Sequence, residues 1–154
     1  MPIRGKLEGG FEAKSSADKL WGALRDWDTI FPKAFPDAYK AVDIVEGDGK
    51  AVGSVFRVSI TGDSPYAKSF TETIEAVDDA KRTITFDVAG IDGNIFNLNK
   101  KYMLHVSVTP KGDRSEVKIK VEYENPREKD PEPIGILDVE IQGLQDFDSY
   151  LQNK

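Results

Sequence analysis

Glu72 is the residue of this chain whose type and position best suit acid–base chemistry. It lies in the alternating segment Tyr66–Val77, where Phe70, Ile74 and Ala76 define an apolar face. Steps of two along a regular strand place Glu72 on that same face. A carboxylate held among apolar side chains has its pKa raised by desolvation, which suits proton transfer near neutral pH. The alternation therefore predicts a candidate general acid or base inside the fold.

Two structural interpretations of Glu72 remain open beside the catalytic one. A β-bulge would shift the phase of the strand and turn the side chain outward. Alternatively, Lys68 and Glu72 would lie on one face and pair at the rim of a pocket. Ion pairs that only stabilise a fold often resemble active sites, which favours these two interpretations.

Three tyrosines offer hydroxyl groups to the same interior. Tyr39, Tyr102 and Tyr123 fall on or near the inward phase of their strands, and each joins an apolar ring to one hydroxyl. Such a hydroxyl can orient a polar ligand group or assist proton transfer, so Tyr102 and Tyr123 join Glu72 as candidate catalytic residues. Ordinary core tyrosines with hydroxyls bonded to the backbone explain the pattern at least as well.

Nuclease, phosphate and metal chemistry receive little support. His105 is the only histidine, whereas a ribonuclease-type mechanism needs a general base and a general acid. Leu104 and Val106 share the apolar face of its strand, so His105 should face solvent. The glycine-rich loop 47–53 joins two strands and is not followed by Gly-Lys-Ser/Thr, so it does not predict a phosphate site. Cysteine is absent and no cluster has the spacing of metal ligands, so we expect neither metal nor cofactor.

Composition narrows the class of protein further. The chain has 154 residues, 27 of them acidic and 21 basic, and its basic residues are not concentrated anywhere, so we expect no nucleic-acid binding. No apolar run approaches membrane-spanning length, and the N-terminal residues lack the apolar core of a secretory signal. We therefore expect a cytoplasmic monomer with one domain over residues 1–154 and no membrane insertion.

Alternation with a period of two predicts seven antiparallel strands joined by short turns. The first carries Ile3, Leu7 and Phe11 on one face. The other six are predicted at Tyr39–Glu46, Ser54–Thr61, Tyr66–Val77, Arg82–Ala89, Asn97–Thr109 and Ser115–Glu124. Apolar residues on one face and charged ones on the other, clearest in the last strand, indicate a sheet covered on one side.

Helical spacing occurs in two places. Ser15 or Ser16 should cap a short helix, and a second short helix should stop near Pro32 and Pro36. At the C-terminus, an apolar stripe predicts a long helix that covers the sheet, with Gly143 inside it. That glycine either keeps space open beneath the helix or allows close packing against an aromatic ring. The predicted fold class is α+β: a seven-stranded curved antiparallel sheet wrapped on a long C-terminal helix, with two short helices between strands 1 and 2.

Seven stretches of the chain resemble plant major latex proteins, which belong to the Bet v 1 / pathogenesis-related class 10 superfamily. They occur in the order and spacing of that family and span nearly the whole chain. The stretches are GKLE (5–8), KSSADKLW (14–21), FPKAFPDAYK (31–40), EGDGKAVGSV (46–55), IEAVDDAKRTITF (74–86), VTPKGD (108–113) and VEYE (121–124).

The resemblance implies a large internal cavity, which periodicity alone cannot show. Members mostly bind apolar small molecules such as sterols, flavonoids, hormones or alkaloids. A minority resemble cofactor-free enzymes that condense, cyclise or isomerise reactive intermediates. The condensing enzymes use a lysine, a tyrosine and carboxylates, and no matching set can be placed in this sequence.

Two functional hypotheses follow. The first is a binding protein for an apolar small molecule of the terpenoid, steroid, flavonoid or alkaloid class. The second is a cofactor-free cyclase or isomerase that steers a reactive monoterpenoid (iridoid-type) or alkaloid intermediate by positioning it. Besides the candidate catalytic tyrosines, the residues expected to line the cavity are Phe31, Phe35, Tyr39, Phe56, Phe70, Phe86, Phe96, Ile134, Leu137, Ile141 and Leu144.

Overall fold

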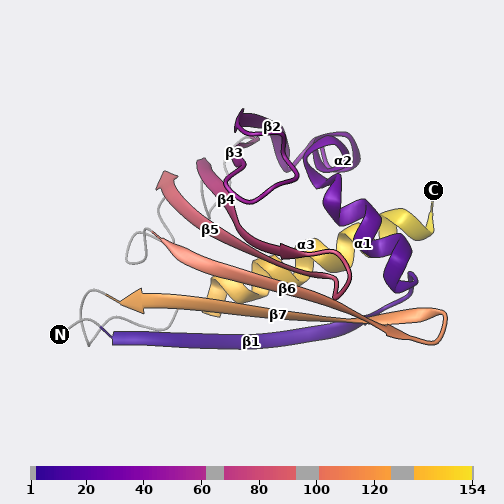
Figure 1. The fold of residues 1–154 in the computed structure, drawn as a ribbon. Coiled ribbons are helices and arrows are strands. Elements are labelled where there is room, and N and C mark those ends of the chain that lie inside the picture. The colour runs from indigo at the N-terminus through magenta and orange to yellow at the C-terminus, as the bar shows by residue number, and fades with distance from the viewer. Residues whose placement is uncertain (1–2, 62–67, 93–100, 126–133, 154) are drawn as a thin grey trace.

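A computed structural model describes residues 3–61, 68–92, 101–125 and 134–153 (Figure 1). Its elements, in chain order, are β1 (Ile3–Ala13), α1 (Ala17–Arg25), α2 (Trp27–Ala34), β2 (Tyr39–Glu46), β3 (Val55–Ile60), β4 (Ser69–Asp78), β5 (Thr83–Asp92), β6 (Tyr102–Lys111), β7 (Arg114–Asn125) and α3 (Ile134–Gln152). The predicted fold class is confirmed. The predicted strand starts at Tyr66 and Asn97 lie outside the described residues.

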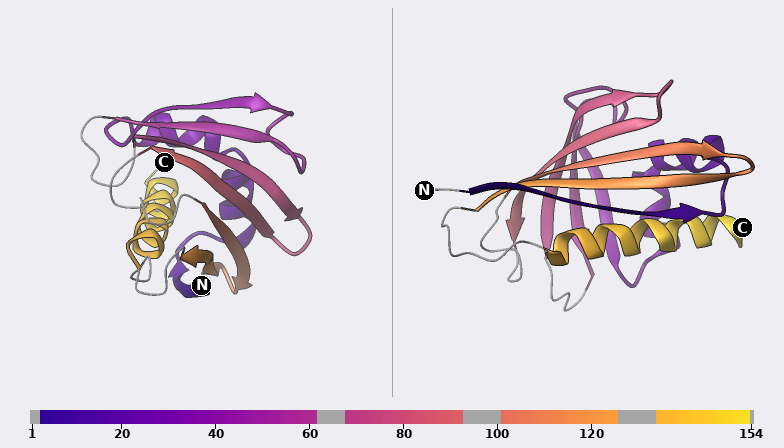
Figure 2. Two further views of the ribbon diagram at one scale, coloured as in Figure 1. Left: turned by 90° about the vertical axis from the view of Figure 1, so that its left-hand side faces the viewer. Right: turned by 90° about the horizontal axis from the view of Figure 1, so that it is seen from below.

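The seven strands form one antiparallel sheet in the order β1-β7-β6-β5-β4-β3-β2. Figure 2 shows that the sheet curves around α3, which runs along its hollow side. The helix lies against β1 and β7 and reaches α2 near its C-terminal end. The short helices α1 and α2 pack on the same hollow side, so the sheet and the three helices enclose one interior.

Two glycines of β1 let the sheet and its neighbours come close together. A Cβ atom on Gly9 would lie 2.7 Å from Cδ1 of Ile141 in α3, and one on Gly5 would lie 2.5 Å from Oη of Tyr123 in β7. Both distances are shorter than real Cβ atoms make with atoms to which they are not bonded. The glycines therefore make room for a helix side chain and for a tyrosine ring.

The C-terminal end of α3 is fixed to the junction of β1 and α1. The buried carboxylate of Asp148 accepts hydrogen bonds from the backbone N–H of Lys14 at 2.9 Å and of Ser15 at 3.0 Å. Ser16 is the residue that caps α1, since its hydroxyl accepts from the N–H of Lys19 at 3.3 Å. Ser15, the other predicted cap, instead holds α3 in place, with Gln152 donating to its hydroxyl.

The inward face of β4 departs from the predicted alternation. The pairing of β4 with β5 shifts between Ile74 and Ala76: Ile74 pairs with Phe86, and Ala76 pairs with Thr85. Ala76 is therefore exposed, and its predicted place on the inward face is wrong. This irregularity is a bulge of the kind considered for Glu72, but it comes after that residue. A second shift in the same pairing, between Ser69 and Thr71, comes before Glu72 and still leaves its side chain buried.

Candidate functional site

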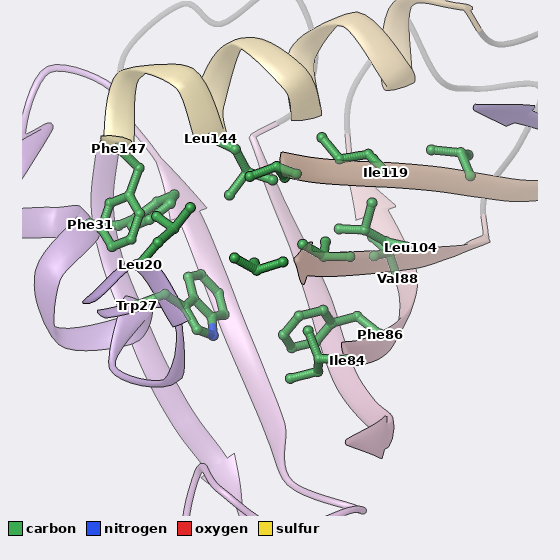
Figure 3. Packing of buried hydrophobic residues seen from close by; sticks show 14 of the residues in the cluster. Leu20, Trp27, Phe31, Ile84, Phe86, Val88, Leu104, Ile119, Leu144 and Phe147 are labelled. Atoms are coloured by element: carbon green, nitrogen blue, oxygen red, sulfur yellow. The ribbon is translucent and has the colours of Figure 1, made fainter. Parts of the chain in front are cut away.

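An inner cavity of about 80 Å³ lies between the sheet and all three helices. Figure 3 shows Leu20, Trp27 and Phe31 on one side of this interior, strand residues such as Phe86 and Leu104 on the other, and Leu144 reaching in from α3. The lining residues are Trp21, Leu24, Arg25, Trp27, Phe31, Tyr39, Phe70, Glu72, Ile84, Phe86, Leu104, Val106, Glu140 and Leu144. The wall is thus mostly apolar with a few polar groups, as in most small-molecule sites.

Aromatic rings form a continuous wall on the helical side. Trp27 meets Phe31 edge-on with ring centroids 5.7 Å apart, and it also contacts Phe56 at 5.0 Å and Phe86 at 6.1 Å. Phe31 in turn meets Tyr39 at 5.1 Å. Ring pairs in this geometry attract one another, so the helical side of the cavity presents a packed aromatic surface.

Glu72 faces this cavity. The side chain is 7% exposed, and Glu72 forms no hydrogen bond within the described part of the chain. Its strand partners are Phe56 in β3 and Val88 in β5, both buried. Lys68 is exposed and makes no ion pair with Glu72 among the described residues, so the rim-pair interpretation does not hold.

A second carboxylate, Glu140 of α3, lines the same cavity and is bonded to a predicted tyrosine. The hydroxyl of Tyr102 donates to Oε1 of Glu140 at 3.2 Å. Burial raises the pKa of Glu140 to about 7, although the bond from Tyr102 opposes the change. Burial, and then the negative charge of Glu140, raise the pKa of Glu72 well above its ordinary range. Near neutral pH the two carboxyl groups therefore retain protons that exposed glutamates have lost.

The two cavity-side tyrosines are kept in their neutral form. Burial is the main reason why the pKa of Tyr39 and that of Tyr102 are raised, and the nearby charges of Glu140 and Glu72 raise both further. Both hydroxyls therefore remain donors over the physiological range. This makes Tyr102 a fixed hydrogen-bond donor beside two titratable carboxyl groups.

Among the described residues that line the inner cavity, Arg25 is the one basic residue, and its charge is already paired. Its Nε lies 3.1 Å from Oδ1 of Asp79, and its guanidinium donates to the carbonyl of Lys50 at 2.7 Å. The described lining of the cavity thus carries more unpaired acidic than basic groups.

A second hollow of about 440 Å³, here called the vestibule, adjoins the inner cavity. It is lined by Phe31, Phe35, Ala38, Tyr39, Asp138, Val139, Gln142, Gly143 and Asp146. Phe31 and Tyr39 line both spaces, so their rings form the partition between them. A Cβ atom on Gly143 would meet nothing within 4 Å. Of the two interpretations of this glycine, the structure favours the one in which it keeps space open beneath α3.

The structure brings six of the predicted residues together at the inner cavity: Phe31, Tyr39, Phe70, Glu72, Phe86 and Leu144. Phe35 lines the vestibule, and Tyr102 reaches the site through Glu140. Others lie elsewhere. Phe56 is buried behind Trp27, Leu137 and Ile141 fill the space over Gly9, and the ring of Tyr123 lies against Gly5, outside the cavity lining. Phe96 is outside the described residues, and the side chain of Ile134 is not among those described.

Sequence reasoning missed Trp27 as a wall of the cavity and Glu140 as a second carboxylate. A signal for Glu140 was present, since it follows Leu137 by three positions and precedes Leu144 by four. That spacing places it on the apolar stripe of the helix. A charged residue on such a stripe is the kind of exception that marks a site.

His105 lies on the outer face of the sheet, as predicted. Its Nδ1 is 2.8 Å from the hydroxyl of Thr85, and its Nε2 is 2.7 Å from Oε1 of Glu122, a close polar contact without the alignment of a hydrogen bond. Within the described ranges, no group of three or more histidine and acidic side chains could hold a metal ion. No helix among the described residues has the length and apolar character needed to cross a membrane.

Comparison with known proteins gives consistent matches. The model of the Pathogenesis-related protein Bet v 1 family matches residues 3–154. MLP-like protein 423 of Arabidopsis thaliana is 34% identical over 151 residues, which cover 98% of this chain and 96% of that protein. A crystal structure of ginseng major latex-like protein 151 from Panax ginseng has a TM-score of 0.82 at 25% identity, covering 96% of this chain and 97% of that one. Norcoclaurine synthase from Thalictrum flavum, in complex with dopamine and hydroxybenzaldehyde, has a TM-score of 0.72 at 22% identity and covers 99% of this chain and 86% of that one.

Proposed function

Because the chain belongs to the Pathogenesis-related protein Bet v 1 family, we propose that it binds an apolar small molecule in its internal cavity. The observation that carries the proposal is the aromatic-walled inner cavity, which adjoins an open vestibule. Rigid rings supply apolar contact area at little entropic cost, and each Å² of apolar surface removed from water contributes about 25 cal/mol.

The ligand extends from the inner cavity into the vestibule. Sites for drug-sized molecules have volumes of roughly 300–1,000 Å³, whereas the inner cavity measures about 80 Å³ and the vestibule about 440 Å³. Phe31 and Tyr39 contact both spaces, so their rings turn to admit a molecule that occupies the two together. Selectivity then depends on the shape of the ring wall and on the few polar groups behind it.

Binding can be tested with a series of neutral apolar molecules, followed by the fluorescence of Trp27 and Trp21 at the cavity wall. Gly143→Leu places a side chain into the vestibule and should weaken binding at least tenfold. Gly22→Leu is the matched control, since Gly22 is exposed in α1 with nothing near its Cβ position. A series in which no member binds, or a Gly143→Leu protein that binds as the unmodified chain does, would refute the proposal.

A second candidate function is a cofactor-free cyclase or isomerase. It is favoured by the buried carboxyl of Glu72, which faces the cavity and forms no hydrogen bond with any other described residue. Near neutral pH, one carboxyl of the pair can donate a proton while the other accepts one. Such a pair can remove a proton from one atom of a reactive intermediate and return it at another, which changes the connectivity or the double bonds without an oxidant. Monoterpenoid dialdehydes of the iridoid type and alkaloid precursors are intermediates that react in this way.

The enzyme hypothesis is tested by generating an enolised monoterpenoid dialdehyde with substoichiometric amounts of the protein and measuring the product ratio. A ratio that stays changed over many equivalents of substrate establishes turnover. Glu72→Gln should then lower the rate with little loss of binding, whereas Glu75→Gln, an exposed position on the same strand, should not. Product ratios unchanged across several precursor classes would rule against catalysis and leave binding as the function.

A further inference from the structure

We propose that the small molecule bound here is an amine carrying a positive charge, and that Glu72 of β4 and Glu140 of α3 hold this charge between them. The inference rests on the proposed binding function and names the chemical class of the ligand.

Glu72 provides the first reason. Its side chain is more than nine-tenths buried, faces the cavity, and has no hydrogen-bond donor within the described part of the chain. An ionised carboxylate in that position lacks the donors that normally offset its desolvation. A ligand ammonium group carries up to three N–H donors together with the opposite charge, so it supplies what the protein does not.

Glu140 provides the second reason, because it approaches from a different element. One of its oxygens accepts the Tyr102 hydroxyl at 3.2 Å, which fixes the carboxyl in place. Without a ligand the negative charges of Glu140 and Glu72 oppose one another: burial first, and then the charge of Glu140, raise the pKa of Glu72. A cation placed between the two turns this repulsion into attraction on both sides.

The surrounding charges favour a cation over an anion or a neutral polar group. Arg25, the basic residue of the inner lining, is paired with Asp79 and donates to a backbone carbonyl. The described lining of the vestibule includes two carboxylates, Asp138 and Asp146, and no basic side chain. A cation therefore meets negative charge in the vestibule and again in the inner cavity. This raises its local concentration in both spaces.

The apolar part of the ligand has a place beside the same groups. Trp27, Phe31 and Tyr39 present rings to the cavity, and such rings attract cations as well as apolar surface. The chemistry thus fits an arylalkylamine or a similar amine with a compact apolar body.

Binding of the charged amine depends on pH in a defined direction. The ammonium group is held by ionised carboxyls, and the pKa of Glu140 is about 7 without ligand. Affinity should therefore rise as the pH increases from 5.5 to 8, where the amine itself, with a pKa near ~10 like that of lysine, remains protonated. The tyrosines stay neutral over this range and do not reverse the trend.

The test compares 2-phenylethylamine with its neutral isostere 2-phenylethanol by titration calorimetry at pH 5.5 and pH 8. The amine should bind at least tenfold more tightly than the alcohol at pH 8, and this preference should shrink to less than threefold at pH 5.5. Measurements near pH 6.5 in buffers of different ionisation enthalpy should show release of between one and two protons on amine binding, because both carboxyls must ionise.

Three variants assign the effect to the carboxyl pair. Glu72→Gln and Glu140→Gln should each remove the preference for the amine and leave binding of the alcohol within threefold. Glu75→Gln, exposed on β4, should keep the preference, and circular dichroism checks that each variant is folded. An alcohol that binds as tightly as the amine, or a preference that survives in both cavity variants, would overturn the inference while leaving the binding function intact. If neither probe binds and the neutral series also fails, the binding function is overturned as well.

Discussion

Glu140→Gln should remove a loss of stability that the unmodified protein suffers as the pH rises. The pKa of Glu140 is about 7 in the folded protein and near its ordinary value of 4.5 when the chain is unfolded. Between these values the folded state holds more protons than the unfolded state, so the free energy of unfolding falls with increasing pH. At about 1.4 kcal/mol per pH unit, this interval corresponds to about 3 kcal/mol. The stabilisation that the raised pKa gives the folded state is fully present below pH 4.5. It is lost as the pH rises through 7.

Urea unfolding at pH 5 and pH 8, on the unmodified chain and on Glu140→Gln, measures this difference. The unmodified protein should lose about 2.5 kcal/mol more than the variant over this range, or about 5–10 °C in Tm for a chain of this size. Groups that titrate elsewhere are common to both proteins and cancel in the comparison. Glu72→Gln should flatten the profile in the same direction, because it removes a carboxyl raised by the same environment.

Glu75→Gln serves as the control, since an exposed substitution should change the profile by no more than about 0.5 kcal/mol. Parallel pH profiles for the unmodified protein and Glu140→Gln would refute the reasoning. A free energy of unfolding that falls less for the unmodified protein than for Glu140→Gln between pH 5 and pH 8 would also refute it. Either result would mean that the Glu140 carboxyl is solvated rather than held in the cavity.

Three further substitutions test the packing that positions the site, each by urea unfolding at pH 7. Asp148→Ala removes both acceptors of the β1–α1 junction and should cost about 3 kcal/mol; a cost below 1 kcal/mol would show that water replaces them. Gly5→Ala drives a methyl group into the ring of Tyr123 and should cost about 2 kcal/mol, and an unchanged stability would contradict the close approach. Gly22→Ala, with open space at its Cβ position in α1, should instead stabilise the protein by about 1 kcal/mol, and a destabilised variant would place an unseen contact there.

Most of the secondary structure was accessible from local pattern. β2 was predicted with its observed bounds, Tyr39–Glu46, and the alternation in β7 put Val117, Ile119 and Val121 on the buried face where the structure has them. The bulge in β4 was not locatable, because it depends on how Ile74 and Ala76 pair with β5, a contact between strands that no single segment encodes.

The residues of the candidate site likewise fall into those that local pattern could predict and those that depend on tertiary packing. Sequence pointed to Phe31, Phe70 and Glu72 because inward phase and residue type are local properties. It missed Trp27 and misplaced Phe56, because which aromatic side chain faces a cavity and which lies behind it depends on how α2 packs on the sheet.

By itself the sequence determined which faces are apolar, where the chain turns and which family the chain resembles, since periodicity and local residue choice carry that information. Only the tertiary structure decided that Glu72 of β4 and Glu140 of α3 line one cavity and that Tyr102 is bonded to Glu140. The reason is physical. A pKa shift depends on burial and on through-space distances between charges, and both arise only when α3 packs into the hollow of the curved sheet (Figure 2).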